Sequence, residues 1–417
     1  MDKNKRLTVW LPVIIAASIA LGIFIGNHYL SISQGKKRSY SSGNKINAIL
    51  DIIDEQYVDT VSMSKLVEST IPKIFSELDP HSVYIPAEDA SVVNEELEGS
   101  FSGIGVSFNM QTDTILVISV ISGGPAEKAG LLPFDRIISI NDSIFSGKKK
   151  NQGEIMKTLR GAKNSTVKLG VQRGNSPELL YFDVTRGDVP VNSVDVSYEA
   201  AKGIGYIKVS KFARNTYNEF ITAIAKLKQA GCTSFVIDLR GNTGGYMDAA
   251  INMINEFMPE GRLIVYTEGK SFPRSDVYAN GTGTCKDAPI VVLTDEISAS
   301  ASEIFSGAIQ DNDRGTIIGR RTYGKGLVQT QMSLSDGSEM RLTIARYYTP
   351  SGRCIQKKYE MGNTDAYDQD IYNRYMHGEF DSADSIKMDD SLKYQTVGGR
   401  TVYGGGGIMP DILSLVI

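Results

Sequence analysis

The chain opens on an unbroken run of apolar residues. Residues 7–25 (LTVWLPVIIAASIALGIFI) carry no charge, and Lys3, Lys5 and Arg6 stand before them. A helix of this length spans about 28 Å, close to the roughly 30 Å hydrocarbon core of a bilayer. A buried helix of a globular core would normally show a polar face, which this run lacks. No small-residue cleavage pattern follows it, so residues 1–30 are predicted to be an uncleaved membrane anchor.

Helical spacing of apolar residues begins after a polar linker, residues 31–43. Five apolar residues recur at the spacing of one helix face: Ile46, Ile49, Leu50, Ile53 and Tyr57. A second helix is predicted around residues 63–78. The segment Asp79-Pro80-His81-Ser82 ends it, because proline cannot continue a helix. Residues 31–98 are therefore assigned to a linker and a helical region.

Short apolar runs separated by turn residues characterise residues 99–187. The predicted strands are 115–120, 136–140, 166–171 and 179–185. Two helices are predicted between them, over residues 126–129 and 151–160, and Gly130 closes the first. This pattern predicts a separate, small, β-rich domain.

Strands and helices alternate along residues 188–355. Continuous apolar runs predict buried strands at 205–209, 235–239 and 290–293, and helical patterns fill 216–230, 248–258 and 300–310. Such alternation is typical of a largely parallel sheet covered by helices. Thr216 and Glu219 stand in capping-box spacing at one helix start. Asp336-Gly337 predicts a hairpin turn, and residues 356–417 are expected to pack on this core as a C-terminal extension.

Composition and charge exclude several classes of function. The net charge is −4 and the isoelectric point about 5.6, so no basic surface for nucleic acid is expected. Only three histidines occur, His28, His81 and His377. Neither they nor the three cysteines have metal-site spacing, and no metal or other cofactor is expected. Cys232 is expected to be buried. The sequence does not decide whether Cys285 and Cys354 form a disulfide bond.

Ser300 lies in Ser298-Ala299-Ser300-Ala301-Ser302-Glu303, between a predicted buried strand and a predicted helix. A side chain at such a turn lies at the helix N-terminus, where unpaired N–H groups and the helix dipole stabilise negative charge. This suits a nucleophile whose attack creates an oxyanion. Small residues that merely allow tight packing would give the same pattern, so the motif alone does not decide.

Lys325 lies between glycines in Tyr323-Gly324-Lys325-Gly326. The segment 319–326 nearly matches a phosphate-binding loop, but it ends in glycine where magnesium needs serine or threonine, which excludes a nucleotide site. A lysine acts as a general base only when it is neutral. Its free pKa is about 10.4, and lowering it by about three units costs around 4 kcal/mol, which deep burial can supply. Taken alone, the residue is equally explained as a solvated lysine on a turn.

Gln329 follows Lys325 by four positions. On an extended strand, residues 325, 327 and 329 face the same side. A neutral amide can accept a hydrogen bond from the lysine amine without restoring its charge, as a carboxylate would. Gln329 is therefore a candidate third member of the site, and a polar residue on a half-exposed strand is the plain alternative.

Two glycine-rich segments offer backbone donors. Residues 238–245 (DLRGNTGG) follow a buried strand, at the sheet edge where α/β proteins form sites, and could complete an oxyanion hole with the amide of Ala301. Residues 102–106 (SGIGV) open the small domain. A glycine-bearing loop before an exposed strand can capture a terminal carboxylate while the peptide adds as a further strand. A glycine-rich connection and a plain β-turn are the alternatives.

The order of these segments resembles the C-terminal processing (tail-specific) serine peptidases. The resemblance runs from about residue 44 to the end, and three further segments carry it: 78–84 (LDPHSVY), 205–209 (GYIKV) and 407–411 (GIMPD). Each motif is weak singly, but several in one order are specific. The implied fold is multidomain, α/β and α+β. It has a membrane anchor and helical region, a PDZ domain at 99–187 and an α/β serine-protease core with a mixed sheet at 188–355.

The resemblance also implies roles for individual residues. Ser300 is the implied nucleophile, Lys325 its base and Gln329 the support of the base. The implied oxyanion donors are Ala301 and Gly245, with Gly244 as the nearby alternative. The implied peptide-binding residues of the PDZ domain are Gly103, Ile104, Gly105, Val106 and, as a gating contact at the end of its helix, Arg160. His81 is interpreted as a structural residue of its turn.

The function implied is that of an endopeptidase of the cell envelope, anchored in the inner membrane with its catalytic part on the extracytoplasmic side. Its partners would be protein substrates with exposed apolar C-termini, captured by the PDZ domain, and the N-terminal helices could serve a homodimer. An inactive PDZ scaffold is one rival, against which the intact Ser300, Lys325 and Gln329 argue. A carboxypeptidase-like exoenzyme is another. The stretch 357–402 is longer than a minimal family member needs.

Overall fold

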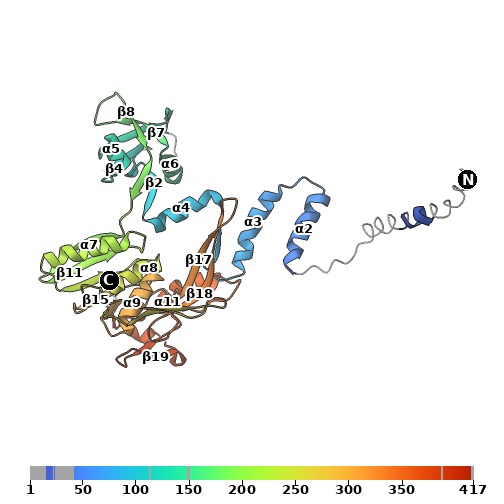
Figure 1. The fold of residues 1–417 in the computed structure, drawn as a ribbon. Coiled ribbons are helices and arrows are strands. Elements are labelled where there is room, and N and C mark those ends of the chain that lie inside the picture. Colours follow the sequence, from blue (N-terminus) through green and yellow to red (C-terminus); the bar gives the residue numbers. More distant parts are fainter. Residues whose placement is uncertain are drawn as a thin grey trace, which may run out of the picture. The chain divides into compact units, whose positions relative to one another are not determined.

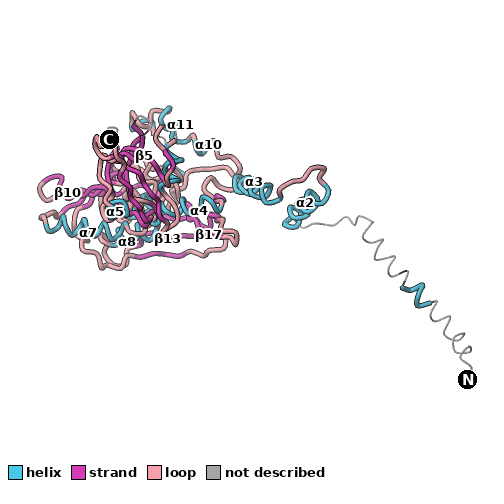
Figure 2. The backbone as a smooth tube through the Cα atoms, turned by 90° about the horizontal axis from the view of Figure 1, so that it is seen from above, coloured by secondary structure: helices cyan, strands magenta, loops and turns pink. Residues whose placement is uncertain are grey.

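The computed structural model describes most of the chain (Figures 1 and 2). The described residues are 16–21, 23, 42–111, 114–147, 151–386 and 388–414. The predicted anchor, residues 7–25, lies largely outside them, and none of the described helices is long and apolar enough to cross a membrane. The chain divides into two compact units, residues 1–70 and 71–417.

The first unit contains α2 (Ser42–Gln56) and the first half of α3 (Met63–Ser76). Both predicted helices are confirmed, and α3 ends two residues earlier than predicted. In α2, the exposed fractions of Ile46, Ile49 and Ile52 are 50, 46 and 51%. Within the described chain, the apolar face of α2 is therefore only half covered.

Residues 99–187 form a small domain built on an antiparallel sheet with two short helices. Its strands are β3 (Val106–Gln111), β4 (Thr114–Val120), β5 (Arg136–Ile140), β6 (Ser143–Ile144), β7 (Thr166–Gln172) and β8 (Leu180–Thr185). They run in the order β3-β4-β5-β7-β8, and β6 pairs with β5. The helices are α5 (Pro125–Ala129) and α6 (Gln152–Leu159). The predicted strands and helices of this domain are confirmed to within two residues.

One two-stranded ribbon carries the chain into and out of this domain. In the ribbon, β2 (Ser100–Gly103) pairs antiparallel with β9 (Gly187–Pro190). The helix α4 (Ala87–Glu98) ends at Gly99, which adopts a left-handed φ of 74° immediately before the ribbon. The turn lets the chain leave the helix directly into β2.

A six-stranded sheet forms the centre of the core. Its strands, in spatial order, are β10 (Val194–Ala201), β11 (Ile204–Val209), β12 (Ser234–Asp238), β15 (Ile290–Thr294), β16 (Thr316–Gly319) and β21 (Ile412–Leu413). All neighbours from β11 to β21 are parallel, and only β10 is antiparallel to its neighbour. The prediction of a largely parallel sheet is confirmed.

Three helices supply the apolar cover of this sheet: α7 (Thr216–Gln229), α8 (Met247–Asn255) and α9 (Ala301–Asp311). The helix α8 contacts both α7 and α9. Every residue of α9 is buried, so the segment that follows Ser300 is enclosed by the core.

The core contains a second sheet, which is antiparallel, so it combines parallel and antiparallel strand pairing. Its strands are β1 (Val83–Ile85), β13 (Leu263–Glu268), β14 (Ser275–Tyr278), β17 (Leu327–Ser333) and β18 (Glu339–Tyr348). The predicted hairpin around Asp336-Gly337 is confirmed as β17 and β18. The strand β1, which follows the Asp79–Ser82 turn, pairs with β18, so this turn belongs to the core sheet and not to a separate helical region.

One local expectation is corrected, and one open question is answered. The predicted capping box is wrong, because Glu219 accepts hydrogen bonds from the amides of Ser193 (2.7 Å) and Val194 (2.9 Å) and ties β10 to α7. The hydroxyl of Thr216 instead accepts from the amide of Ala213 at 2.7 Å. Long-range partners have displaced the local cap. All three cysteines are free, so the bond left open between Cys285 and Cys354 is not formed.

The extension beyond residue 355 contains α10 (Asp365–Asp368), α11 (Asp370–Met376), β19 (Lys393–Gln395) and β20 (Thr401–Tyr403). Buried charges fix it to the core. Arg374 donates to the carbonyls of Arg321 (2.7 Å) and Thr322 (3.1 Å). Arg353, which forms a fully buried ion pair with Asp311 in the core, donates to the carbonyl of Tyr403 in the extension at 2.8 Å. The extension therefore packs on the segment that leads to Lys325.

Candidate active site

Ser300 lies at the N-cap of α9, where the chain turns from β15 into the helix. Its backbone has φ 55° and ψ −113°, a region that residues with a Cβ rarely occupy and that costs of order 1–3 kcal/mol. Hydrogen bonds hold it there: its amide donates to Oε2 of Glu303 at 2.8 Å and its carbonyl accepts from the Tyr347 hydroxyl at 3.1 Å. A strained serine at a strand-to-helix turn is the geometry of an exposed nucleophile.

Glu303, three residues further along, is fully buried and joins two segments. Its Oε2 accepts from the amides of Ser300 and Lys325, each at 2.8 Å. Its Oε1 accepts from the amide of Gly324 at 2.7 Å and from the Thr322 hydroxyl. Burial raises the pKa of Glu303, and these hydrogen bonds oppose the rise. One side chain thus sets the spacing between the nucleophile turn and the lysine turn.

Lys325 is the lysine of this site. Its Nζ donates to Oε1 of Gln329 at 3.1 Å. Burial lowers the pKa of Lys325, and the charge of Arg341 acts in the same direction. The carboxylates of Asp79 and Glu303 oppose the shift. A lowered pKa increases the fraction of neutral amine, which a general base requires.

Gln329 meets Lys325 as the sequence predicts, although the strand between them is irregular. The ladder of β17 with β18 shifts register between Val328 and Gln329, so strict alternation does not set the direction of the side chain. The direction of the Gln329 side chain is set by a hydrogen bond from its Nε2 to the carbonyl of His81. This fixes which end of the amide faces the lysine, because the nitrogen donates to His81 and the oxygen is left for Lys325.

Ser300, Lys325 and Gln329 line one cleft, with a volume of about 720 Å³. The helix α4 contributes Val93 and Leu97 to the wall, and the loop after β12 contributes residues 243–248. Among the described residues, no hydrogen bond joins Ser300 to Nζ of Lys325, which donates to Gln329 instead. Hydrogen bonds between catalytic partners are often long until substrate is bound.

The loop after β12 supplies the backbone beside Ser300. A Cβ on Gly244 would lie 2.7 Å from Cβ of Ser300, and the φ of Gly244 is 103°, so only glycine fits there. The amide of Gly244 donates to Oδ1 of Asn242 at 2.8 Å, which leaves it no free hydrogen. In the described structure the amides of Gly245 and Ala301 have no hydrogen-bond partner. These two amides are therefore free to act as the oxyanion donors that the sequence predicts, whereas the Gly244 amide is occupied and its missing side chain leaves room for Ser300.

Asp238 holds the start of this loop. It is 1% exposed and accepts hydrogen bonds from Nε (2.9 Å) and Nη2 (2.7 Å) of Arg240. The hydroxyl of Tyr206 donates to it at 2.5 Å. The pKa of Asp238 is lowered because its hydrogen bonds, those of Arg240 first, outweigh desolvation. The carboxylate therefore fixes the loop as an anion.

The predicted peptide-binding loop lies between β2 and β3 of the small domain. Ile104 is buried and Gly105 has φ 79°. The carbonyls of these two residues accept from Ala126 (2.7 Å) and Ile121 (2.9 Å), and Val106 starts β3. Their amides remain without a partner among the described residues, as capture of a carboxylate requires.

Arg160 ends α6 and reaches outside the small domain. Its Nη1 donates to Oε2 of Glu95 in α4 at 3.0 Å, and its guanidinium lies over the Phe101 ring, 4.5 Å from the centroid. A Cβ on Gly103 would lie 3.6 Å from Cγ of Arg160. Since α4 also lines the cleft, Arg160 connects the peptide-binding loop to a wall of the site.

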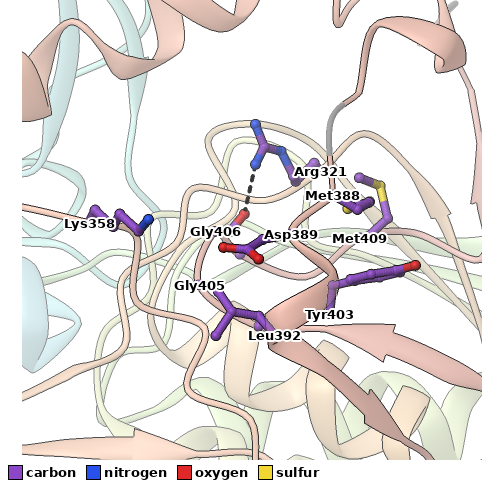
Figure 3. A pocket seen from close by; sticks show the side chains of 11 residues that line it. Arg321, Lys358, Met388, Asp389, Leu392, Tyr403, Gly405, Gly406 and Met409 are labelled. Carbon is purple, nitrogen blue, oxygen red and sulfur yellow. Dashed lines mark hydrogen bonds between the residues drawn. The ribbon is translucent and has the colours of Figure 1, made fainter.

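A second cavity lies between the core and the extension (Figure 3). It has a volume of about 160 Å³ and is lined by Arg321, Lys358, Met388, Asp389, Leu392, Tyr403, residues 404–407 and Met409. Arg321 donates to the carbonyl of Gly406 at 3.4 Å and pairs with Glu379. This lining contains no serine, threonine or cysteine, and no metal-binding cluster occurs among the described residues.

Family models match two parts of the chain. A model of peptidase family S41 matches residues 203–365, and a PDZ-domain model matches residues 102–195. A solved photosystem II D1 C-terminal processing protease is 28% identical, with 75% of this chain and 90% of that chain covered at a TM-score of 0.41.

Two curated relatives identify the family. Carboxy-terminal processing protease CtpB of Bacillus subtilis is 35% identical over 318 residues, 76% of this chain and 66% of that protein. A probable CtpA-like serine protease of Staphylococcus aureus is 33% identical over 365 residues, 86% of this chain and 72% of that protein. The chain belongs to peptidase family S41, the serine-type C-terminal processing proteases, and carries a PDZ domain.

Sequence reasoning missed the residues that hold the site together. Glu303 stands three residues after Ser300, a capping-box spacing that could have indicated its contact with the serine amide. The carbonyl of His81 orients Gln329, and nothing in the pattern around residue 81 indicates a partner 248 positions away.

Proposed function

We propose that this chain is a serine endopeptidase with a Ser300–Lys325 dyad that cleaves proteins near their C-termini. The observation that carries the proposal is the strained Ser300, which shares a cleft with a half-buried lysine of lowered pKa and with Gly245, whose amide has no partner among the described residues. The unpartnered amide of Ala301 follows Ser300 directly in the chain. A nucleophile, a base and an oxyanion site are the three parts that acyl transfer needs.

The proposed reaction has two halves. Oγ of Ser300 attacks the peptide carbonyl, and Nζ of Lys325 accepts the hydroxyl proton. The amides of Gly245 and Ala301 stabilise the oxyanion. When the C–N bond breaks, the Lys325 ammonium returns the proton to the leaving amine. Water then repeats the attack on the acyl-enzyme with Lys325 again as base, which releases the acid and regenerates Ser300.

The PDZ domain is proposed to capture the substrate tail. An apolar C-terminus would add as a strand beside β3, with its carboxylate on the amides of Ile104 and Gly105. Arg160 is proposed to act as a gating contact, because its partner Glu95 belongs to the helix that lines the cleft. Binding at the PDZ domain would thereby bias the position of α4.

Location and assembly follow from the N-terminal region as proposals. The apolar run 7–25 supports anchoring in the inner membrane, with the catalytic part on the extracytoplasmic side and envelope proteins as substrates. The half-exposed apolar face of α2 supports a homodimer. Sedimentation of the full chain beside an Ile46→Asp, Ile49→Asp variant tests this, and an unchanged sedimentation coefficient would exclude α2 as the contact.

A serine-directed fluorophosphonate probe and an unstructured substrate with an apolar C-terminus test the central proposal. The wild-type chain is expected to be labelled at Ser300 and to cleave the substrate, and Ser300→Ala should do neither. Ser306→Ala is the matched control, because its buried hydroxyl only donates to the Ser302 carbonyl of the same helix. Mass spectrometry of the products separates internal cuts from single-residue trimming. An inert wild-type chain would leave an inactive peptide-binding scaffold.

A further inference from the structure

Two side chains of the extension beyond residue 355 approach Lys325: Gln356, and Tyr367 in α10. This tyrosine is 3% exposed. Its hydroxyl lies 2.8 Å from Nε2 of His81, and the two rings meet edge to face with their centroids 5.3 Å apart. His81 is the residue whose carbonyl receives Gln329. A residue of the extension is therefore two contacts away from the partner of Lys325.

The direction of these hydrogen bonds follows from the groups present. Oε1 of Gln356 accepts from the amide of Gly326 at 2.7 Å, so its Nε2 is free to donate to the Tyr367 hydroxyl at 3.4 Å. The hydroxyl hydrogen is then available to Nε2 of the His81 ring. Burial lowers the pKa of His81 to about 4, and the charge of Lys325 contributes. A neutral imidazole can accept at Nε2.

The contacts close a ring around Lys325. From Nζ they pass to Gln329, then to the His81 carbonyl, and from the His81 ring to Tyr367. Through Gln356 they return to the amide of Gly326, the residue next to the lysine. The backbone and the side chain of one residue are thus fixed by the same set of hydrogen bonds.

Other contacts fix His81 and Tyr367 independently. Oδ1 of Asp79 accepts from the amide of His81 at 3.0 Å, which holds the backbone of this turn. The Tyr323 ring packs against Tyr367 with centroids 6.0 Å apart, and Nζ of Lys357 lies 4.0 Å from the Tyr367 ring centroid. The ring of Tyr367 is therefore held by packing, while its hydroxyl contacts His81, Gln356 and Tyr323.

We propose that Tyr367 is a positioning residue for the catalytic lysine, which it orients through His81 and Gln329. The inference rests on the Ser300–Lys325 chemistry proposed above and assigns part of the stretch 357–402 to it. The Tyr367 hydroxyl fixes the imidazole. The imidazole, together with the contact of Asp79 to the His81 amide, fixes the carbonyl of His81, and that carbonyl decides which atom of the Gln329 amide faces the amine.

Tyr367→Phe removes the hydroxyl and keeps the ring. It is expected to lower kcat by about tenfold, the effect of about 1.4 kcal/mol, and to leave KM within about twofold. Tyr359→Phe is the matched control, because this neighbouring ring also packs on Tyr367 while its hydroxyl has no partner among the described residues. It should retain wild-type kcat. Equal kcat in the two variants would overturn the inference.

A double-mutant cycle separates positioning from general support of the fold. Because Tyr367 acts through Gln329, adding Tyr367→Phe to Gln329→Ala should cost less than about twofold more. Losses that multiply would contradict the inference. A crystal structure of Tyr367→Phe gives a readout that needs no activity: the Gln329 amide should leave the His81 carbonyl, and an unchanged Lys325–Gln329–His81 arrangement sinks the inference. An inert wild-type chain would instead refute the proposed function.

Discussion

The amide of Ser300 donates a hydrogen bond of 2.8 Å to the carboxylate of Glu303, and this carboxylate also receives the amide of Lys325. The two proposed catalytic residues are 25 positions apart in the sequence, and their backbones share one acceptor. The strain at Ser300 is therefore held by a buried group that belongs to neither side of the proton transfer.

Glu303→Gln is expected to abolish activity and to lower the free energy of unfolding by about 3 kcal/mol or more. The new amide nitrogen cannot accept, so two N–H donors would face another donor in a buried site. Denaturant unfolding followed by fluorescence measures the loss. Glu127→Gln is the control, since this exposed carboxylate accepts a hydrogen bond from the Gly123 amide within its own turn. Wild-type stability of Glu303→Gln would contradict the shared-acceptor role.

The pH dependence of kcat/KM is expected to follow Lys325. Burial lowers its pKa below the ordinary 10.5, and only the neutral amine accepts a proton, so kcat/KM should rise with pH and level off above the lowered pKa. Gln329→Glu places a carboxylate against the ammonium, which raises the pKa and moves the rise to higher pH. The exposed Gln395→Glu adds the same charge elsewhere and should leave the profile unchanged. A profile of Gln329→Glu that coincides with the wild type would exclude Lys325 as the base.

Lys325→Met should remove activity and raise the melting temperature. Between the lowered pKa and 10.5 the unfolded chain binds one more proton than the folded chain, so Lys325 makes stability increase with pH in that window. Below the window its burial as a cation is a constant cost. Methionine removes the cost of burying a cation, and it removes the contribution of residue 325 to the pH dependence of stability. Thermal unfolding across pH tests this against Lys358→Met, an exposed lysine whose loss should change neither quantity. A lower melting temperature for Lys325→Met would speak against a buried, destabilised amine.

Gly244→Ala is expected to lower kcat/KM by at least about 100-fold, because displacement by about 1 Å at a reacting centre has effects of this size. The new Cβ would lie 2.7 Å from Cβ of Ser300 and would push the loop from the serine. Gly241→Ala is the control in the same loop. Its φ of 73° is also left-handed, but a Cβ there meets nothing within 4 Å. It should lose about 1 kcal/mol of stability and keep its activity. Equal activity of the two variants would contradict the role assigned to the close approach of Gly244 to Ser300.

The predictable part of this protein is the part that nearest neighbours in the sequence decide. Apolar runs predicted the strands β12 and β15, and glycine and proline residues predicted where helices and strands end. These signals are local because the pleat and the helical turn repeat within four residues. The capping box predicted at Thr216 is absent because the contacts that decide it are not local. Glu219 had a local partner available, but the amides of Ser193 and Val194 need a buried acceptor, and the fold brings them to it.

The order of motifs along the chain determined the family, and it predicted Ser300, Lys325 and Gln329 as candidate site residues, which the structure places in one cleft. These residues could be predicted because each motif carries its polar group within a few positions of its glycines. Only the tertiary structure decided how the groups act together. Glu303 joins two turns, His81 orients Gln329 from 248 positions away, and Tyr367 reaches His81 from the extension. Such contacts depend on where the strands pair, and pairing between distant segments leaves no periodic trace in the residues that it brings into contact.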